Sequence, residues 1–222
     1  MQITQVKQSI KTIYPQSSDI KLRLMTFYGK LKRQIARPPY PRLEDGKLYL
    51  HLGCGSINHE KFVNIDALPA PHIHYIRSLD NLSPFKDETV DLIYASHCLE
   101  HFSHRKIPSI LEEWFRVLKP GGVLRLSVPD FDAIYRIYSA SHDDLNAILE
   151  ILMGGQNYKY NFHMAAFNQA SMAELLSNAG FKSNRPWEPG SCDLTRFSDF
   201  SVYTILVFDQ AYPMSLNIEA IK

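Results

Sequence analysis

The segment Lys47-Leu48-Tyr49-Leu50-His51-Leu52-Gly53-Cys54-Gly55-Ser56-Ile57-Asn58 decides the fold of this chain. Its apolar start is typical of a buried strand. The strand runs into two glycines, which allow backbone torsions that other residues avoid and let the main chain approach a ligand closely. A second strand, residues 62–65, ends on Asp66. This order predicts an adenosine-like ligand at the carboxyl edge of a parallel sheet, with the carboxylate accepting hydrogen bonds from the ribose.

A tight turn beside a surface aspartate would explain the same residues, so other segments have to support the ligand interpretation. Only six residues, 56–61, separate Gly55 from the second strand. A full crossover helix takes ten or more residues, so we expect at most a turn or two of helix here.

The composition indicates one globular domain with an ordinary share of hydrophobic residues, 45% of the 222. A formal net charge of +1 gives no overall field that would recruit nucleic acid or an anionic membrane. Three widely spaced cysteines, Cys54, Cys98 and Cys192, form no disulfide framework. The chain has neither the apolar core of a secretory signal at its start nor a run of about 18 apolar residues. We therefore expect a cytoplasmic protein.

Residues 1–46 differ from the rest of the chain. The segment 21–37 carries six basic residues and no acid, and its apolar residues recur at helical intervals. The prolines in residues 38–41 end this helix and form a stiff connector. A basic amphipathic helix can lie on a membrane or dock a partner. The interpretation we favour is that it packs on its own domain with its charges in water.

The remaining segments alternate between strands and helices, which predicts an α/β open sheet wrapped on both faces. The expected strands are residues 70–76, 90–95, 123–128 and 200–208. The expected helices are residues 106–118, 131–153 in two pieces broken near Ser141, and 171–179. Loops are expected at residues 78–85, 119–122 and 154–163.

In this order, the motifs resemble class I S-adenosylmethionine-dependent methyltransferases of the methyltransferase-11 type. The matching motifs are residues 50–55, 63–66, 90–97 with 99–101, 118–122 and, later, 179–181. The resemblance implies a Rossmann-like, doubly wound, mostly parallel seven-stranded sheet whose last strand, about residues 200–208, is antiparallel. It divides the chain into a helical N-terminal extension, residues 1–46, and a methyltransferase domain, residues 47–222.

The resemblance also implies that S-adenosylmethionine is the cofactor. The residues it places at the cofactor are Gly53, Cys54, Gly55, Asp66, Leu79, Asp80, Ser96 and His97. The glycines would lie under the methionine end, and Asp66 would accept hydrogen bonds from both ribose hydroxyls. The residue beside adenine could be Ser78 rather than Asp80, because the loop acid is poorly registered.

Methyl transfer from a sulfonium mainly requires alignment of nucleophile, methyl and sulfur, with water excluded. A base is useful only if the nucleophile must lose a proton, and histidine suits an oxygen nucleophile near neutral pH. We predict His163, then His97, as this base. The predicted substrate pocket is formed by His101, Asp130, Tyr135 and Tyr160, with Tyr158 a further aromatic candidate. Each of these residues could instead be structural.

The predicted activity is methyl transfer to oxygen of a small-molecule or glycan acceptor, with no metal. One alternative is a non-catalytic relative that binds the cofactor and serves as a partner. Another is a zinc hydrolase, because His97-x-x-Glu100-His101 fits a zinc-binding pattern, although the sequence offers no evident third ligand. A nicotinamide enzyme would need a third glycine where Asn58 stands. Nucleic-acid methylation is disfavoured because the basic residues cluster in one helix rather than along a groove.

Overall fold

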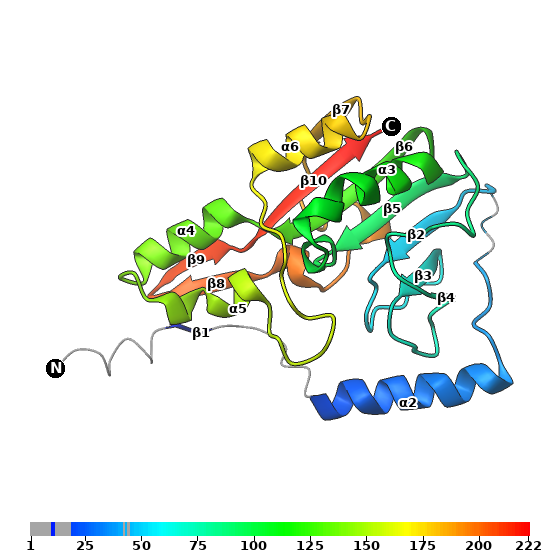
Figure 1. Cartoon of the computed structure of the whole chain (residues 1–222), viewed down its shortest axis with the longest axis horizontal. Coiled ribbons are helices and arrows are strands. Elements are labelled where there is room, and N and C mark those ends of the chain that lie inside the picture. Colours follow the sequence, from blue (N-terminus) through cyan, green and yellow to red (C-terminus); the bar gives the residue numbers. More distant parts are fainter. Residues whose placement is uncertain (1–9, 12–18, 42, 44) are drawn as a thin grey trace.

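The computed structural model describes residues 10–11, 19–41, 43 and 45–222. Its main feature is a seven-stranded sheet in the order β4-β3-β2-β5-β6-β10-β7 (Figure 1). Only β10 runs antiparallel to its neighbours. The strands are β2 (Tyr49–Leu52), β3 (Phe62–Asp66), β4 (Tyr75–Ile76), β5 (Val90–Ser96), β6 (Leu118–Pro129), β7 (Ser183–Pro186) and β10 (Ser215–Ile221). The predicted mostly parallel, Rossmann-like sheet with one antiparallel strand is thus confirmed.

The helices lie close to their predicted positions. They are α2 (Asp19–Ile35), α3 (Ile107–Val117), α4 (Phe131–Ala140), α5 (Leu149–Met153) and α6 (Gln169–Asn178), with 3₁₀ turns η1 (Leu99–His101), η2 (His104–Lys106), η3 (Leu145–Ala147), η4 (Asp193–Thr195) and η5 (Phe200–Val202). The expected break near Ser141 separates α4 from η3 and α5. The helix α6 begins with a capping box between Asn168 and Ser171, which satisfies backbone donors of its first turn.

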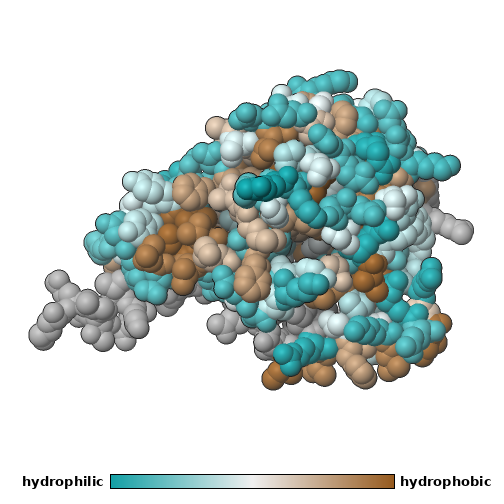
Figure 2. Space-filling view, in the orientation of Figure 1, coloured by the Kyte–Doolittle hydropathy of each residue, from teal (hydrophilic) through white to brown (hydrophobic). Residues whose placement is uncertain are grey.

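Among the residues of α2 whose side chains the structure describes, Gly29 and Arg33 contact the domain. A Cβ at Gly29 would lie 2.6 Å from Ala70 Cα, and the Arg33 guanidinium donates a hydrogen bond to the Ile73 carbonyl oxygen. Its apolar face points away from the domain: Leu24 is 62% exposed and Phe27 68%. Figure 2 shows hydrophobic residues on this helix at the lower edge of the molecule. The favoured interpretation, that the helix packs on its own domain, holds for the Gly29 face and not for the apolar face.

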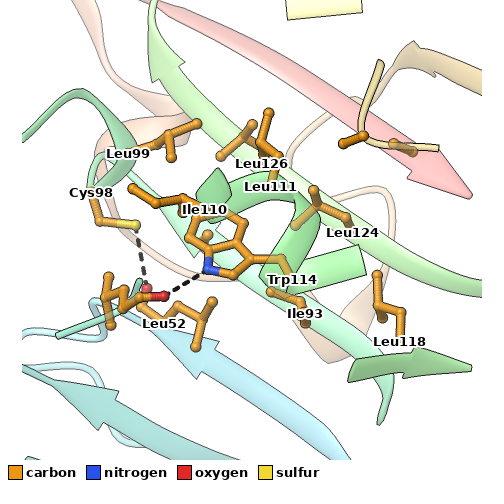
Figure 3. Packing of buried hydrophobic residues seen from close by; sticks show 14 of the residues in the cluster. Leu52, Ile93, Cys98, Leu99, Ile110, Leu111, Trp114, Leu118, Leu124 and Leu126 are labelled. Atoms are coloured by element: carbon orange, nitrogen blue, oxygen red, sulfur yellow. Dashed lines mark hydrogen bonds between the residues drawn. The ribbon is translucent and has the colours of Figure 1, made fainter. Parts of the chain in front are cut away.

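The two faces of the large sheet are covered differently. On one face α3 and α6 bury the core around the fully buried Trp114 (Figure 3). On the other face Trp187 and Phe197, from an irregular segment, pack against Tyr94 and Phe62. Burial on both faces explains why these strands read as continuous apolar runs. None of the helices formed by the described residues is long and apolar enough to cross a membrane.

A second, three-stranded sheet contains the segment 200–208, which the sequence predicts as the last strand of the seven-stranded sheet. Residues 200–202 form the 3₁₀ turn η5, and β8 (Thr204–Val207) joins β1 (Ile10–Lys11) and β9 (Gln210–Pro213) in the order β1-β8-β9. The prediction that residues 200–208 form the antiparallel strand of the large sheet is therefore wrong. That strand is β10, and β8 alternates between half-buried and buried residues because its sheet covers α4 and α5 on one side only. The pairing of β1 with β8 also ties the N-terminal extension to the domain.

Two shorter segments also differ from expectation. The predicted strand 70–76 is reduced to Tyr75–Ile76. The predicted turn 119–122 lies within β6, where the pairing with β5 shifts register between Val90 and Leu92. Such an irregularity accommodates extra residues without ending the strand.

Candidate functional site

The glycine turn joins β2 to the residues before β3. Gly53 has φ +64° and Gly55 has φ +54°, torsions that glycine adopts at little cost. A Cβ at Gly53 would lie 2.7 Å from Cys98 Cβ, so the turn packs tightly against the segment after β5. A Cβ at Gly55 would meet no described atom within 4 Å. The turn is therefore closed behind Gly53 and open at Gly55.

Asp66 closes this turn from the end of β3. Its Oδ2 accepts a hydrogen bond from Gly55 N at 2.9 Å, and its Oδ1 accepts one from Leu68 N at 2.8 Å. Burial raises the pKa of Asp66, and the backbone donors partly oppose that rise. The carboxylate thus lies directly beside the open side of the glycine turn, with further lone pairs on both oxygens.

Two further residues interact with this part of the site: His72, which we did not assign to it from the sequence, and Tyr158, the further aromatic candidate for the substrate pocket. His72 Nε2 donates a hydrogen bond to the Gly55 carbonyl oxygen at 3.0 Å. Burial raises the pKa of Tyr158, and the negative charge of Asp66 raises it further. The connection between α5 and α6, which carries Tyr158, therefore lies within electrostatic range of Asp66. The sequence placed Tyr158 in an aromatic loop but gave no sign of its neighbour.

The residues expected near adenine follow β4. Leu79 is buried, and its Cδ1 would lie 3.4 Å from a Cβ at Gly53. The Leu79 carbonyl oxygen accepts a hydrogen bond from the Trp114 indole at 2.9 Å, shown in Figure 3. Asp80 is half-buried, with Lys106 Nζ 3.6 Å from its Oδ2, whereas Ser78 is exposed. Leu79 is thus fixed against the turn by α3.

Cys54, between the two glycines, points away from the open side. Its side chain is buried with Ala70 and Ile73, and burial raises the pKa of its thiol well above the ordinary value. Only the main chain of Cys54 is therefore available to a ligand on the turn.

Ser96 and His97 end β5, where His97 has φ +49°. The His97 ring is largely buried: its Nε2 lies 2.7 Å from Ser215 Oγ, and its Nδ1 lies 3.4 Å from Glu100 Oε1. Both ring nitrogens of His97 therefore have protein neighbours. The prediction of His97 as a base stays a prediction, and its geometry favours a structural contact.

A carboxylate and two histidines meet beyond this strand end. Glu100 and His101 lie on η1, and His163 comes from the connection between α5 and α6; one ligand atom of each lies within 4.8 Å of the others. Burial opposes ionisation of Glu100, but the hydrogen bond from His97 and the charges of the histidines hold its pKa below the usual value. Burial is the main cause of the lowered pKa of His163.

The spacing His97-x-x-Glu100-His101 does not lie on one α-helix, as the zinc-hydrolase alternative requires. His97 precedes a 3₁₀ turn and points toward Ser215, whereas His163 joins Glu100 and His101 instead. The residue set of that alternative is therefore wrong, because the left-handed backbone at His97 turns its ring aside.

The other predicted pocket residues are spread out. Asp130 caps α4, accepting a hydrogen bond from Asp132 N at 3.1 Å, and burial raises its pKa. Tyr135, on α4, is 64% exposed, and Tyr160 is 40% exposed. The structure gives none of these three a contact with the histidine cluster, and their role in a substrate pocket stays a prediction.

Sequence comparisons match the central part of the chain. Residues 59–126, about a third of the chain, match the family model described as "Methyltransferase domain". The chain is 28% identical over 121 residues to the ubiquinone/menaquinone biosynthesis C-methyltransferase UbiE of Vibrio campbellii, covering 51% of this chain and 46% of that protein. The protein of that name from Neisseria meningitidis serogroup B is 29% identical over 108 residues, covering 45% and 42%. The chain therefore matches about half the length of these curated relatives.

Solved structures share the fold over most of the chain. A SAM-dependent methyltransferase from Archaeoglobus fulgidus aligns over 90% of this chain and 94% of its own, with a TM-score of 0.50 and 15% identity. One from Methanosarcina mazei aligns over 83% and 98%, with a TM-score of 0.51 and 18% identity. At these identities the alignments show a shared fold. The shared fold agrees with the predicted mostly parallel, doubly wound sheet.

Proposed function

We propose that this chain, which carries a class I S-adenosylmethionine-dependent methyltransferase domain, binds that cofactor on the glycine turn and transfers its methyl group to a small-molecule acceptor. The observation that carries the proposal is the 2.9 Å contact of Asp66 Oδ2 with Gly55 N, beside open space at Gly55. A glycine turn after one parallel strand and a carboxylate ending the next are the parts that hold an adenosyl ligand in such sheets.

Each of these residues has a physical task toward the cofactor. Gly53 and Gly55 would let the main chain lie against the methionine end, and Asp66 would accept hydrogen bonds from the ribose hydroxyls. Leu79, buried against the turn, offers apolar contact to the adenine. The cofactor supplies an activated methyl group on a positively charged sulfur. The chain then has to orient the acceptor and exclude water, tasks that suit the loop carrying Tyr158.

The proposal for the methyl acceptor names a chemical class of molecule. We propose a small molecule with an ionisable hydroxyl, because such a group activates either its own oxygen or a neighbouring ring carbon toward methylation. The names of the relatives describe C-methyltransferases of ubiquinone and menaquinone biosynthesis, which supports the carbon alternative. Our sequence-based prediction was oxygen of a small molecule or glycan. The mass of the product and its fragments would distinguish the methylated atoms.

The direct experiment is calorimetry with S-adenosylmethionine and S-adenosylhomocysteine. Gly55→Ala adds a methyl group on the proposed ligand side, and we expect it to weaken binding at least about tenfold. Gly121→Ala is the matched control, because Gly121 also has positive φ and open surroundings but lies in β6. Wild-type protein that binds neither compound would contradict the proposal. Binding without turnover of any hydroxylated acceptor would instead favour a non-catalytic relative.

We further propose that residues 1–46 form an extension whose helix α2 lies on an anionic membrane surface. Its outward face is apolar, with Ile20, Leu24, Phe27, Leu31 and Ile35 all more than half exposed. Exposed Arg23 and Lys30 flank this face on one side and Lys32 on the other, at helical spacing. This arrangement suits apolar insertion combined with attraction to anionic lipid headgroups.

Vesicle flotation tests this contact. We expect the full chain to float with vesicles of phosphatidylcholine and phosphatidylglycerol, and to float less with phosphatidylcholine alone. Phe27→Ser should reduce flotation, whereas Phe131→Ser, at a phenylalanine of α4 that is 45% exposed, should not. Equal flotation of wild type and Phe27→Ser would count against a membrane role for α2.

A further inference from the structure

The side chains of Glu100, His101 and His163 form a cluster that the proposed methyl transfer does not use. One ligand atom of each lies within 4.8 Å of the others. Glu100 is 1% exposed, and neither of its oxygens accepts a hydrogen bond of good geometry from a residue that the structure describes. A buried carboxylate with incomplete partners is costly, so this cluster needs a physical explanation.

The backbone contacts of the two histidines fix which nitrogens carry protons. His163 Nδ1 lies 2.8 Å from the Ile151 carbonyl oxygen, and His101 Nδ1 lies 3.2 Å from the Phe162 carbonyl oxygen. A carbonyl oxygen only accepts, so each Nδ1 carries the proton and donates it. In each neutral ring the lone pair is therefore on Nε2.

These lone pairs leave a site for a cation. His163 Nε2 lies 3.9 Å from Glu100 Oε1, and in the neutral ring no hydrogen stands between the two atoms. The ring centroids of His101 and His163 are 5.0 Å apart. The lone pair of His163 Nε2 and the Glu100 carboxylate therefore face each other without a hydrogen between them, and a ring nitrogen of His101 lies within 4.8 Å of the ligand atoms of both.

We propose that Glu100, His101 and His163 bind one divalent transition-metal cation, with zinc as the best-matched occupant. Two imidazoles and one carboxylate are a ligand set that such cations prefer, and further positions stay open for water or another ligand. Metal-binding histidines usually donate their other ring nitrogen to a backbone carbonyl or carboxylate, as both do here.

The separation between His163 and Glu100 is close to the one that a bound cation requires, and the cluster as a whole, within 4.8 Å, would contract around it. Ligand atoms about 2.1 Å from a tetrahedral zinc lie roughly 3.4 Å apart. The 3.9 Å between His163 Nε2 and Glu100 Oε1 therefore needs only a small closure. His97 Nδ1, 3.4 Å from the same oxygen, would orient the carboxylate as an outer partner.

The cation would tie two parts of the chain together beside the glycine turn. Glu100 and His101 follow β5, whereas His163 belongs to the connection that carries Tyr158. Binding would hold this connection in place, and it would occupy the lone pair of His163 that a general base needs. The three side chains are not those proposed to bind the cofactor, so metal binding and cofactor binding can be tested separately.

Metal binding can be measured on the full chain without an affinity tag. The protein would be treated with EDTA, dialysed, and titrated calorimetrically with ZnCl₂ and, separately, with CoCl₂ followed by visible absorption. We expect one Zn²⁺ per chain, Co²⁺ bands typical of four- or five-coordinate sites, a rise in Tm with Zn²⁺, and no comparable rise with MgCl₂. These readouts do not depend on any catalytic activity.

Variants locate the site. Removing an outer partner of a metal ligand typically weakens binding about tenfold to hundredfold, and removing a ligand should cost at least as much. We expect this loss for His163→Ala and His101→Ala, and no loss for His142→Ala, an exposed histidine in the turn after α4. If His163→Ala does not fold, as judged by circular dichroism, His101→Ala decides.

Two results would overturn the proposal. One is the absence of stoichiometric Zn²⁺ binding by the wild-type protein. The other is Zn²⁺ binding that folded His101→Ala retains at wild-type affinity, which would place the cation elsewhere. Neither result would bear on cofactor binding at Asp66.

Discussion

Replacing Asp66 with alanine tests the cofactor site most directly. The carboxylate accepts hydrogen bonds from Gly55 N at 2.9 Å and Leu68 N at 2.8 Å, and it would accept others from the ribose. Hydrogen bonds to a charged group contribute about 1.5–3 kcal/mol. Losing them should raise the dissociation constant for S-adenosylhomocysteine roughly tenfold to hundredfold. The two backbone contacts also involve the charged carboxylate, but water can replace it at the open turn, so their loss should lower the free energy of unfolding by less, about 0.5–1.5 kcal/mol each.

Calorimetry and thermal unfolding separate the two effects. The dissociation constant is measured for wild type, Asp66→Ala, Asp66→Asn and the control Asp209→Ala, which removes an exposed acid from the turn between β8 and β9. Asparagine keeps one acceptor oxygen, so the dissociation constant of Asp66→Asn should lie between those of wild type and Asp66→Ala. A folded Asp66→Ala protein with the wild-type dissociation constant would refute the assignment of Asp66 to the ribose.

Three further predictions address packing and pH. Gly53→Ala should lower the free energy of unfolding by about 1–3 kcal/mol more than Gly121→Ala. Both glycines have positive φ, but only Gly53 would place a Cβ against Cys98. Urea unfolding of the two variants measures this difference, and equal losses of stability would contradict the prediction. Trp114→Phe should lower the free energy of unfolding by about 1–3 kcal/mol beyond lost packing, because it leaves the buried Leu79 carbonyl without its donor. The control is Trp187→Phe, whose indole nitrogen has no hydrogen-bond partner among the described residues, and equal losses in the two variants would mean that the Leu79 contact contributes nothing. Because burial raises the pKa of Asp66, that carboxylate protonates above the ordinary aspartate range, so cofactor affinity should fall as the pH drops through the raised pKa. Asp66→Asn should lack this pH dependence. The pH dependence of stability in the ligand-free protein has the opposite sign, since the stability from this shift is present at low pH and is lost as the pH rises through the folded-state pKa.

The strands around the glycine turn could be predicted because their signals are local. β2, β3 and β5 are buried on both faces, so their residues form short apolar runs that end at glycine, acid or polar residues. The helices α3 and α6 follow from helical periodicity and from stop signals that sit within a few residues of each end.

The antiparallel strand could not be predicted because its polar residues are paired by distant partners. Glu219 of β10 is buried and accepts hydrogen bonds from Arg125 at 2.8 Å and Arg185 at 2.6 Å, on the strands to either side. The segment alternates polar and apolar residues, a pattern of a strand with one face in water, and so it gives no sign that Glu219 is buried between two other strands. Residues 200–208 have strong strand propensity, and propensity does not tell which sheet a strand will join.

The difference between local signals and distant contacts also separates the parts of the site that the sequence predicts from those that it does not. Gly53, Gly55 and Asp66 lie close in sequence, so their spacing carries the geometry. The contact of His72 with the turn, the approach of Tyr158 to Asp66 and that of His163 to Glu100 depend on how two connections fold back over the sheet edge. No short-range pattern encodes such contacts.

The place of β10 between β6 and β7 has a consequence for how the chain is made. On a ribosome, β6 and β7 emerge before β10. Until β10 is made, β6 has one unpaired edge and β7 has none of its pairing in the large sheet, because β7 pairs there only with β10. Such non-local pairing is slow, and waiting edges invite association between nascent chains. We therefore expect assembly of this side of the sheet to be the final kinetic step, and variants that weaken β10 to lower the yield of soluble protein.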